Sequence, residues 1–180
     1  GLVWRNAYLN GVIGIAAAGF LICQAMILWR ARGIPAWRHP SIPWLIVVIG
    51  VLEGVSFLGL ALIGVGIFNS YSAATGYQEY FHKYIQVIAV GGLLTALLSF
   101  GFWQYYMGSM ERFGIGSLAK RSLKQINRVF LPVGQIVPIS LYFASACFIF
   151  FELQVYEYFV AIAAACSIFG GAYWKFCIIT

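Results

Sequence analysis

Residues 43–68 read PWLIVVIGVLEGVSFLGLALIGVGIF, and Glu53 is the only charged residue among them. An apolar stretch of this length crosses the hydrocarbon core of a bilayer as an α-helix. At about 1.5 Å of rise per residue, Glu53 lies roughly 15 Å from the start of that helix, near the middle of the bilayer. Because an ionised carboxylate there costs several kcal/mol, we expect Glu53 to be paired, protonated or turned toward a polar cavity. A structural carboxyl bonded to a neighbouring helix and a functional carboxyl both fit this position.

The composition extends this interpretation to the whole chain. Of the 180 residues, 62% are hydrophobic and 9% are charged, and the mean hydropathy is +0.88. Soluble domains carry about 25% charged residues. The apolar runs lack the short alternation of a membrane β-barrel, so the spanning elements are helices. We therefore predict an all-α integral membrane protein with a single transmembrane domain, residues 1–180, whose five helices cover residues 8–29, 43–68, 84–107, 131–151 and 155–179.

The basic residues are distributed unevenly between the two sides of such a bundle. If the five helices alternate in direction, one side receives Arg30, Arg32, Arg38, Arg112, Lys120, Arg121, Lys124, Arg128 and Lys175. The other side receives only Arg5 and Lys83. The positive-inside rule assigns the first side to the cytoplasm of a multi-pass protein in the inner (cytoplasmic) membrane. The net charge of +6 is then a topology signal, and binding of nucleic acid is not expected.

The interval of residues 114–128 has the pattern of an amphipathic helix. Its apolar positions recur every three or four residues, opposite Lys120, Arg121, Lys124 and Gln125. We predict an interfacial helix on the cytoplasmic side of the membrane. Lys120, Arg121 and Lys124 are its candidate contacts, either with anionic lipid headgroups or with a soluble partner.

The cysteines and histidines indicate which cofactors the chain does not hold. All four cysteines fall inside apolar helices without C-x-x-C spacing, so we expect no iron–sulfur cluster and no metal site. His39 and His82 are the only histidines, and the predicted helices place them at opposite ends of the bundle. Because both ligands of a bis-histidine haem bind one iron, we expect no haem in this chain.

Two motifs resemble a known class of membrane subunits. The loop between the first two helices carries Ala-Arg-Gly-Ile-Pro-Ala-Trp-Arg-His-Pro, and the next helix carries Leu-Glu-Gly. This arrangement resembles the membrane anchor subunits of the DMSO reductase and NrfD (polysulfide reductase) type. The ending Gly-Gly-Ala-Tyr-Trp-Lys-Phe is similar to the last helix of anchors that accompany molybdenum or tungsten oxidoreductases, including the phenylacetyl-CoA acceptor oxidoreductase type.

The resemblance implies a haem-free subunit of eight helices, of which the five helices here are the C-terminal part. Such a subunit passes electrons between a membrane quinone, menaquinone or ubiquinone, and an iron–sulfur partner subunit. The iron–sulfur subunit in turn serves a catalytic subunit with a molybdopterin-type cofactor. On this interpretation the chain has no catalytic residues of its own other than those that act on the quinone.

Quinone chemistry exchanges protons as well as electrons, so it needs a titratable group and hydrogen-bond donors near the quinone oxygens. Glu53 is the candidate for proton handling because it is the only carboxylate in mid-membrane. Gln24, Arg38 and His39, near the cytoplasmic face, are candidates for binding the quinone head group. Each of these three also fits an ordinary role in loop or interface structure.

Two other classes of function remain open at this point. A transporter or channel subunit would use Glu53 as an intramembrane ion or proton site, with the helix bend expected at Pro138 as its broken element. A purely structural scaffold explains the composition but gives Glu53 no role.

Overall fold

The computed structural model describes residues 2–30, 37, 39–69, 75–151, 153 and 155–179. Over these residues the chain forms helices and turns, with no strand. The elements in chain order are α1 (Leu2–Arg30), α2 (Ile42–Asn69), α3 (Thr75–Ser109), the 3-10 helix η2 (Met110–Phe113), α4 (Ser117–Leu131), the π-helical turn η3 (Pro132–Ile136), α5 (Val137–Phe150) and α6 (Tyr156–Ile179).

Five helical stretches are long and apolar enough to cross a membrane, which confirms the predicted multi-pass, all-helical class. They are Gly11–Arg30, Ile42–Gly66, Phe81–Ser109, Ser117–Phe150 and Tyr156–Ile178. The predicted bounds differ most at α3, which begins at Thr75 rather than at residue 84. The added segment, TGYQEYFHK, is too polar to signal a membrane span, yet it continues the helix beyond the apolar part.

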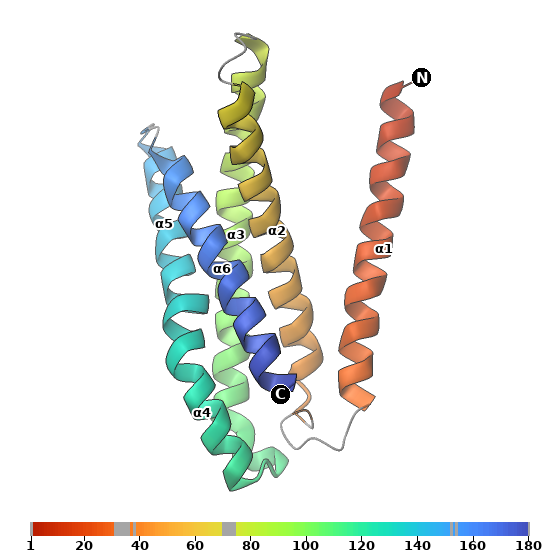
Figure 1. The fold of residues 1–180 in the computed structure, drawn as a ribbon, viewed down its shortest axis with the longest axis vertical. Helices are drawn as coiled ribbons and strands as arrows, with labels where there is room; N and C mark the ends of the chain where they lie inside the picture. Colours follow the sequence, from red (N-terminus) through yellow and green to blue (C-terminus); the bar gives the residue numbers. More distant parts are fainter. Residues whose placement is uncertain are drawn as a thin grey trace.

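The helices α2, α3, α5 and α6 form one bundle, and α1 stands beside it (Figure 1). Helix α1 packs mainly on α2, and its N-terminal half leans away from the bundle, so almost none of its apolar surface is buried within this chain. The contact lies in the C-terminal half of α1, where Leu21 packs against Gly50 of α2.

Most of the basic side chains gather at one end of the bundle, drawn at the bottom of Figure 1, which we call the basic end. Arg30 ends α1, Arg112 lies in η2, and α4 carries Lys120, Arg121, Lys124 and Arg128. The turn between η2 and α4 depends on Gly114, whose φ of 68° is in the left-handed region that glycine enters without strain.

The amphipathic segment predicted for residues 114–128 is helical from Ser117 to Leu131, and it runs directly into the next spanning helix. Helix α4 continues through η3 into α5, so that residues Ser117–Phe150 form one helical rod. The helix widens to a π-helical turn at Pro132–Ile136, directly before Pro138. Proline has no N–H to donate, and the resulting loss of a regular helical hydrogen bond accounts for an irregular turn at this place. The apolar face of α4 therefore packs on the bundle, burying Leu123, Ile126 and Phe130.

The buried core has two parts. The part at the basic end is rich in large rings, including Trp103, Tyr106, Phe130 and Trp174. The part toward the opposite end contains Tyr142 and Tyr156 but also three alanines, Ala89, Ala96 and Ala163. Small residues allow helix backbones to approach closely in membranes, whereas the rings at the basic end fill wider spaces.

Candidate functional site

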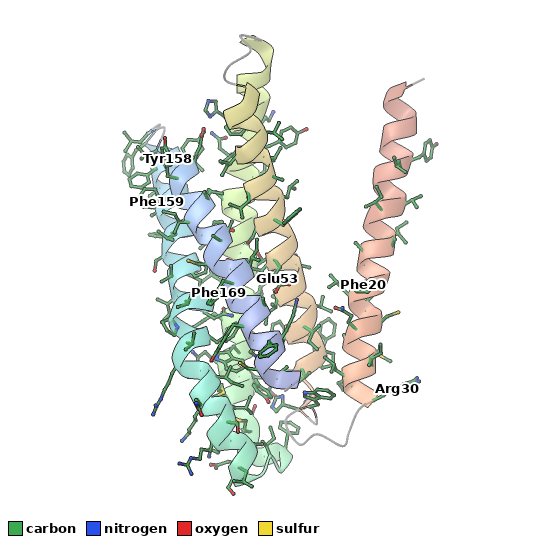
Figure 2. The ribbon with its side chains drawn as sticks, viewed as in Figure 1. Phe20, Arg30, Glu53, Tyr158, Phe159 and Phe169 are labelled. Atoms are coloured by element: carbon green, nitrogen blue, oxygen red, sulfur yellow. The ribbon has the colours of Figure 1, made fainter. Side chains whose placement is uncertain are left out.

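Glu53 of α2 forms an ion pair with Lys175 of α6, through Oε2 and Nζ. Both residues lie inside spanning segments, and Figure 2 shows Glu53 where α2 and α6 meet. The expectation that a mid-membrane carboxylate is paired is therefore met by a cation from a helix 122 residues further along the chain. The charge distribution along the sequence assigns Lys175 to the cytoplasmic side, whereas the structure places it within the span of α6.

The local sequence of α6 creates room for the pair. Gly171 lies one helical turn before Lys175, on the same face of the helix. A Cβ atom at Gly171 would overlap the carboxylate of Glu53, so glycine at this position allows the carboxylate to lie against the backbone of α6. Lys175 then reaches the carboxylate from one turn closer to the basic end, as expected of a long side chain that extends along its helix.

The pair is only partly shielded by this chain. Glu53 is 21% exposed and Lys175 33% exposed, and the α1 side of α2 is close by, because Gly50, one turn before Glu53, meets Leu21 of α1. An uncompensated charge inside a membrane is expensive, and mutual pairing removes much of that cost. The arrangement keeps a carboxylate and an ammonium group ready to exchange hydrogen bonds with a polar group on this side.

A cluster of hydroxyl groups lies one turn from Glu53 on the same seam between α2 and α6. Ser56 Oγ and Tyr142 Oη are hydrogen-bonded at 3.0 Å, and Ser167 of α6 lies beside the same phenol. Ser167 also donates to the carbonyl of Ala163 at 2.9 Å. The ring of Tyr142 packs against Gly92 of α3, where a Cβ atom would come within 2.6 Å of it. The three hydroxyls thus join α2, α5 and α6 in the buried interior.

His39 lies fully buried at the basic end, between the loop after α1 and the end of α3. Its Nδ1 accepts the backbone N–H of Ser41 at 3.1 Å and the Ser41 hydroxyl at 2.7 Å. The neutral ring therefore carries its proton on Nε2, which donates to Ser109 Oγ at 2.8 Å. Burial lowers the pKa of His39 from its usual 6.5 because the charged form loses solvation. Both nitrogens are occupied by protein groups, so this histidine joins the loop to α3.

Of the residues predicted to bind a quinone, the structure describes Gln24 and His39, and it shows no hydrogen bond between either of them and Glu53. Gln24 lies half-buried on α1. Arg38 lies outside the described residues. Of the three candidates that the structure describes, only Glu53 lies beside another charged group within the spans, and its partner Lys175 was not among the candidates.

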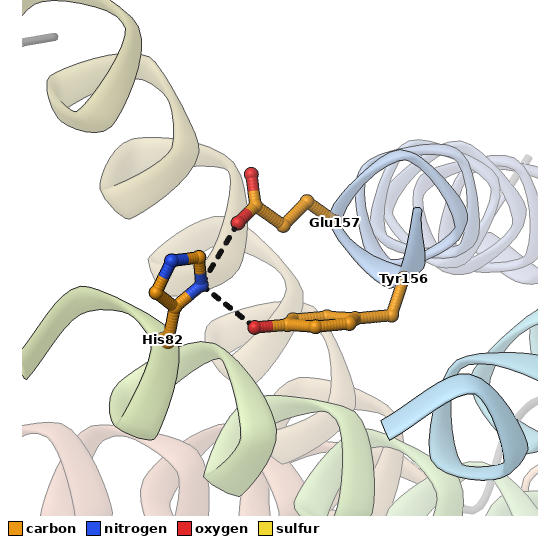
Figure 3. A network of polar contacts seen from close by, with 3 residues as sticks. All are labelled: His82, Tyr156 and Glu157. Atoms are coloured by element: carbon orange, nitrogen blue, oxygen red, sulfur yellow. Dashed lines mark hydrogen bonds and ion pairs between the residues drawn. The ribbon is translucent and has the colours of Figure 1, made fainter. Parts of the chain in front are cut away.

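The opposite end of the bundle holds a second polar cluster, shown in Figure 3. His82 Nδ1 of α3 is 2.7 Å from Tyr156 Oη and 3.2 Å from Glu157 Oε1, both at the start of α6. His82 and Glu157 are partly exposed, whereas Tyr156 is buried. About 40 Å of α3 separates His82 from Ser109, the residue that bonds His39, so the two histidines cannot share one iron.

The candidate contact residues of α4 differ in their pairing. Lys120 forms an ion pair with Glu111 of η2, and the hydrogen bond and charge of this cation lower the pKa of that carboxyl. Arg121 and Lys124 are exposed, and no ion pair holds either of them within the described residues. Beside them the apolar side chain of Leu118 is 81% exposed.

Two features of the site were missed by reasoning from sequence. Lys175 lies close to the end of its apolar segment and resembles a loop residue, although Phe176 to Ile179 continue the apolar run beyond it. His82 served only to exclude haem, because its nearness to Tyr156 and Glu157 depends on packing between α3 and α6. The signal that could have found the ion pair is the presence of one acidic and one basic residue inside spans that are otherwise free of charge at that depth.

No protein family, curated protein or solved structure matched this chain when it was compared with each of the three. Its function must therefore be argued from its own residues, together with the motif resemblance described above.

Proposed function

We propose that this chain is a haem-free membrane anchor subunit of a multi-subunit molybdenum or tungsten oxidoreductase, and that it passes electrons between a membrane quinone and an iron–sulfur partner. The observation that supports this role most is the Glu53–Lys175 pair, a partly exposed acid and base within the membrane spans. Reduction or oxidation of a quinone moves two electrons and two protons. A carboxylate can take up such a proton and the resulting carboxylic acid can give it back, and an ammonium group can donate a hydrogen bond to a quinone oxygen.

The geometry of the pair suits this chemistry better than Glu53 alone would. Lys175 keeps Glu53 compensated while no quinone is bound, which limits the cost of a charge in the membrane. A quinone head group on the α1 side of the pair would find a hydrogen-bond donor and a proton acceptor next to one another. Gly54, adjacent to Glu53 on α2, projects no side chain, and a Cβ atom there would meet nothing within 4 Å.

Partner docking is assigned to the basic end. The rod Ser117–Phe150 contains 34 residues and is about 51 Å long, whereas the hydrocarbon core is about 30 Å thick. Counted from Phe150, about 20 residues cross that core, so most of α4 extends beyond it. Lys120, Arg121 and Lys124 then lie where a soluble iron–sulfur subunit with an acidic surface can reach them, and Arg128 lies nearer the lipid headgroups. By the positive-inside rule this end faces the cytoplasm of the inner membrane.

The test is Glu53→Gln, which keeps the size and hydrogen bonding of the side chain but removes its titration. We expect quinone-linked turnover of the assembled complex to fall by about an order of magnitude or more, the range typical for loss of a general acid or base. Turnover with a soluble dye, which takes electrons from the hydrophilic subunits, should not change. Glu157→Gln, at the other end of α6, is the matched control and should leave both rates near wild type. Unchanged quinone turnover in Glu53→Gln would remove the proton-handling role.

A transporter or channel subunit is the second candidate, favoured by the same pair. Protonation of Glu53 or binding of a cation would release Lys175, which is a familiar way to couple an ion to a helix movement. Purification in mild detergent separates the two proposals. An anchor subunit co-purifies with stoichiometric iron and acid-labile sulfide from its partner. A transporter is purified without them and shows Glu53-dependent ion uptake in liposomes.

A further inference from the structure

The polar cluster at the end opposite the basic end directs two different partners at a single nitrogen atom. His82 Nδ1 lies 2.7 Å from Tyr156 Oη and 3.2 Å from Glu157 Oε1, and Figure 3 shows both contacts converging on this atom. A ring nitrogen of histidine carries either a proton or a lone pair in the plane of the ring. Nδ1 can therefore accept a hydrogen bond or donate one, but it cannot do both at once.

The two partners favour opposite states of Nδ1. Tyr156 is 5% exposed, and a buried phenol needs an acceptor for its hydroxyl proton. The unprotonated Nδ1 of a neutral ring provides that acceptor at hydrogen-bond distance. An ionised Glu157 can only accept, so it favours Nδ1 with a proton. When the ring is charged, the contact with Glu157 is an ion pair with a charge-assisted hydrogen bond.

The position of the cluster allows His82 to exchange a proton with water. The side chains of His82 and Glu157 are both partly exposed. His82 is the second residue of the span Phe81–Ser109, at the end of the bundle that the positive-inside rule assigns to the non-cytoplasmic side. Histidine is the side chain whose charge ordinarily changes between about pH 5 and 8. The relevant pH is therefore that of the external compartment.

The other ionisable side chains described at this end are few. They are Lys83 and Tyr84 of α3, Cys147 of α5 and Tyr158 of α6. The end of α2, residues 60–69, contains no ionisable residue. Lys83 is the one cation of this set, and its side chain is exposed. The side chains of Glu79 and Glu152 lie outside the described residues. Tyr156 and Glu157 are thus the ionisable groups that the structure places against the His82 ring.

We propose that His82 is a pH-dependent switch that exchanges hydrogen-bond partners between α3 and α6. When the ring is neutral, Nδ1 accepts the hydroxyl proton of Tyr156. When the ring is protonated, Nδ1 donates to the carboxylate of Glu157. The contact of α3 with the first turn of α6 thus passes from a buried phenol to a partly exposed carboxylate as the external pH falls. The inference rests on these contacts and does not depend on the redox role proposed above.

Nitrogen NMR of the full chain, labelled with ¹⁵N-histidine and held in lipid nanodiscs, tests the switch. A ring nitrogen with a proton and one without resonate far apart, and the difference between wild type and His82→Gln isolates the signals of His82. We expect its Nδ1 to give the unprotonated signal at about pH 8 and the protonated signal at about pH 5. His39 supplies the reference for an accepting Nδ1 at the higher pH, because its Nδ1 accepts from Ser41. The same Nδ1 signal of His82 at both pH values would overturn the proposal.

Tyr156→Phe tests the neutral state, because it keeps the ring of residue 156 and removes its hydroxyl. Without a phenol to accept from, the neutral His82 should carry its proton on Nδ1 and donate to Glu157, so the signal at about pH 8 should move to the protonated position. Glu157→Gln should instead move the whole transition to lower pH, because the charge that holds the protonated ring is gone. An unchanged signal at the higher pH in Tyr156→Phe would show that the phenol does not hold the neutral ring, and the switch would be wrong. If a variant does not fold, the wild-type signals at the two pH values decide alone.

Discussion

The described part of the chain forms two lysine–glutamate pairs of the same chemistry in different surroundings. Glu111 and Lys120 are 9 residues apart and lie at the basic end, where Glu111 is 79% exposed. Glu53 and Lys175 are 122 residues apart and lie within the spans, where Glu53 is 21% exposed. In water such a pair adds little to stability, whereas inside a membrane each member depends on the other for compensation. The comparison indicates that the local pair adds little to the fold, whereas the distant pair constrains how α2 and α6 pack.

The largest effect is expected from Lys175→Met, which leaves Glu53 without its cation. Breaking a buried pair by removing one partner costs about 3–5 kcal/mol. We expect much less assembled protein and a lower thermal midpoint in fluorescence-detected gel filtration. Lys120→Met, in the exposed pair, is the matched control and should behave as wild type.

The double variant Glu53→Gln/Lys175→Met sharpens the same comparison, because it removes both charges together. The amount of assembled double variant should recover most of the loss seen in Lys175→Met. If Lys175→Met were as stable as Lys120→Met, the distinction between the two pairs would be wrong.

A smaller loss is expected from Gly171→Ala, which tests the packing that holds Glu53 in place. The added methyl group overlaps the Glu53 carboxylate, and overpacking of this kind costs about 1–3 kcal/mol. Gly54→Ala is the control, since a methyl group there would meet no atom within 4 Å although Gly54 is adjacent to Glu53 in sequence. Thermal midpoints of the two variants should therefore differ, with Gly171→Ala the lower. Equal midpoints would show that the carboxylate moves aside freely.

His39 tests whether burial outside the spans is enough to make a charge costly. Because burial lowers its pKa below 6.5, the unfolded chain binds more protons than the folded chain once the pH falls below that value. The contribution of neutral His39 to the free energy of unfolding is thus fully present above about pH 6.5. It decreases as the pH falls toward the lower pKa of the folded state, by up to about 1.4 kcal/mol per pH unit. Thermal midpoints measured from pH 7.5 to 5 should fall less steeply in His39→Asn than in wild type. Parallel curves would contradict the assignment.

The smallest effect is expected from Glu111→Gln at the exposed pair. Exposed pairs are screened by salt and contribute little. The thermal midpoint should stay within experimental error of wild type at moderate salt concentration. A clear drop would mean that the packing of η2 and α4 depends on this contact. The exposed pair would then stabilise the fold, as the pair within the spans does.

Much of the architecture was predictable from the sequence, because each span has to satisfy its own backbone hydrogen bonds and must be apolar over its length. Those two requirements act locally. The five spans and the need for a partner at Glu53 therefore follow from residues 43–68 and from the four other apolar stretches. The separate interfacial helix was predicted because the basic pattern of residues 114–128 stops near Leu131. The structure joins it to α5 instead, since Pro132 begins a π-helical turn rather than a break.

The sequence by itself determined the class of the protein, the number of its spans and the presence of a carboxylate that water cannot solvate. Tertiary structure alone decided that Lys175 is the partner of that carboxylate, that His39 is enclosed by Ser41 and Ser109, and that His82 meets Tyr156 and Glu157. The physical reason is the distance along the chain over which each interaction acts. Hydrophobicity and helix formation are set by neighbours along the chain, whereas pairing inside the membrane depends on which faces of distant helices come together, and glycines such as Gly171 determine how closely they approach.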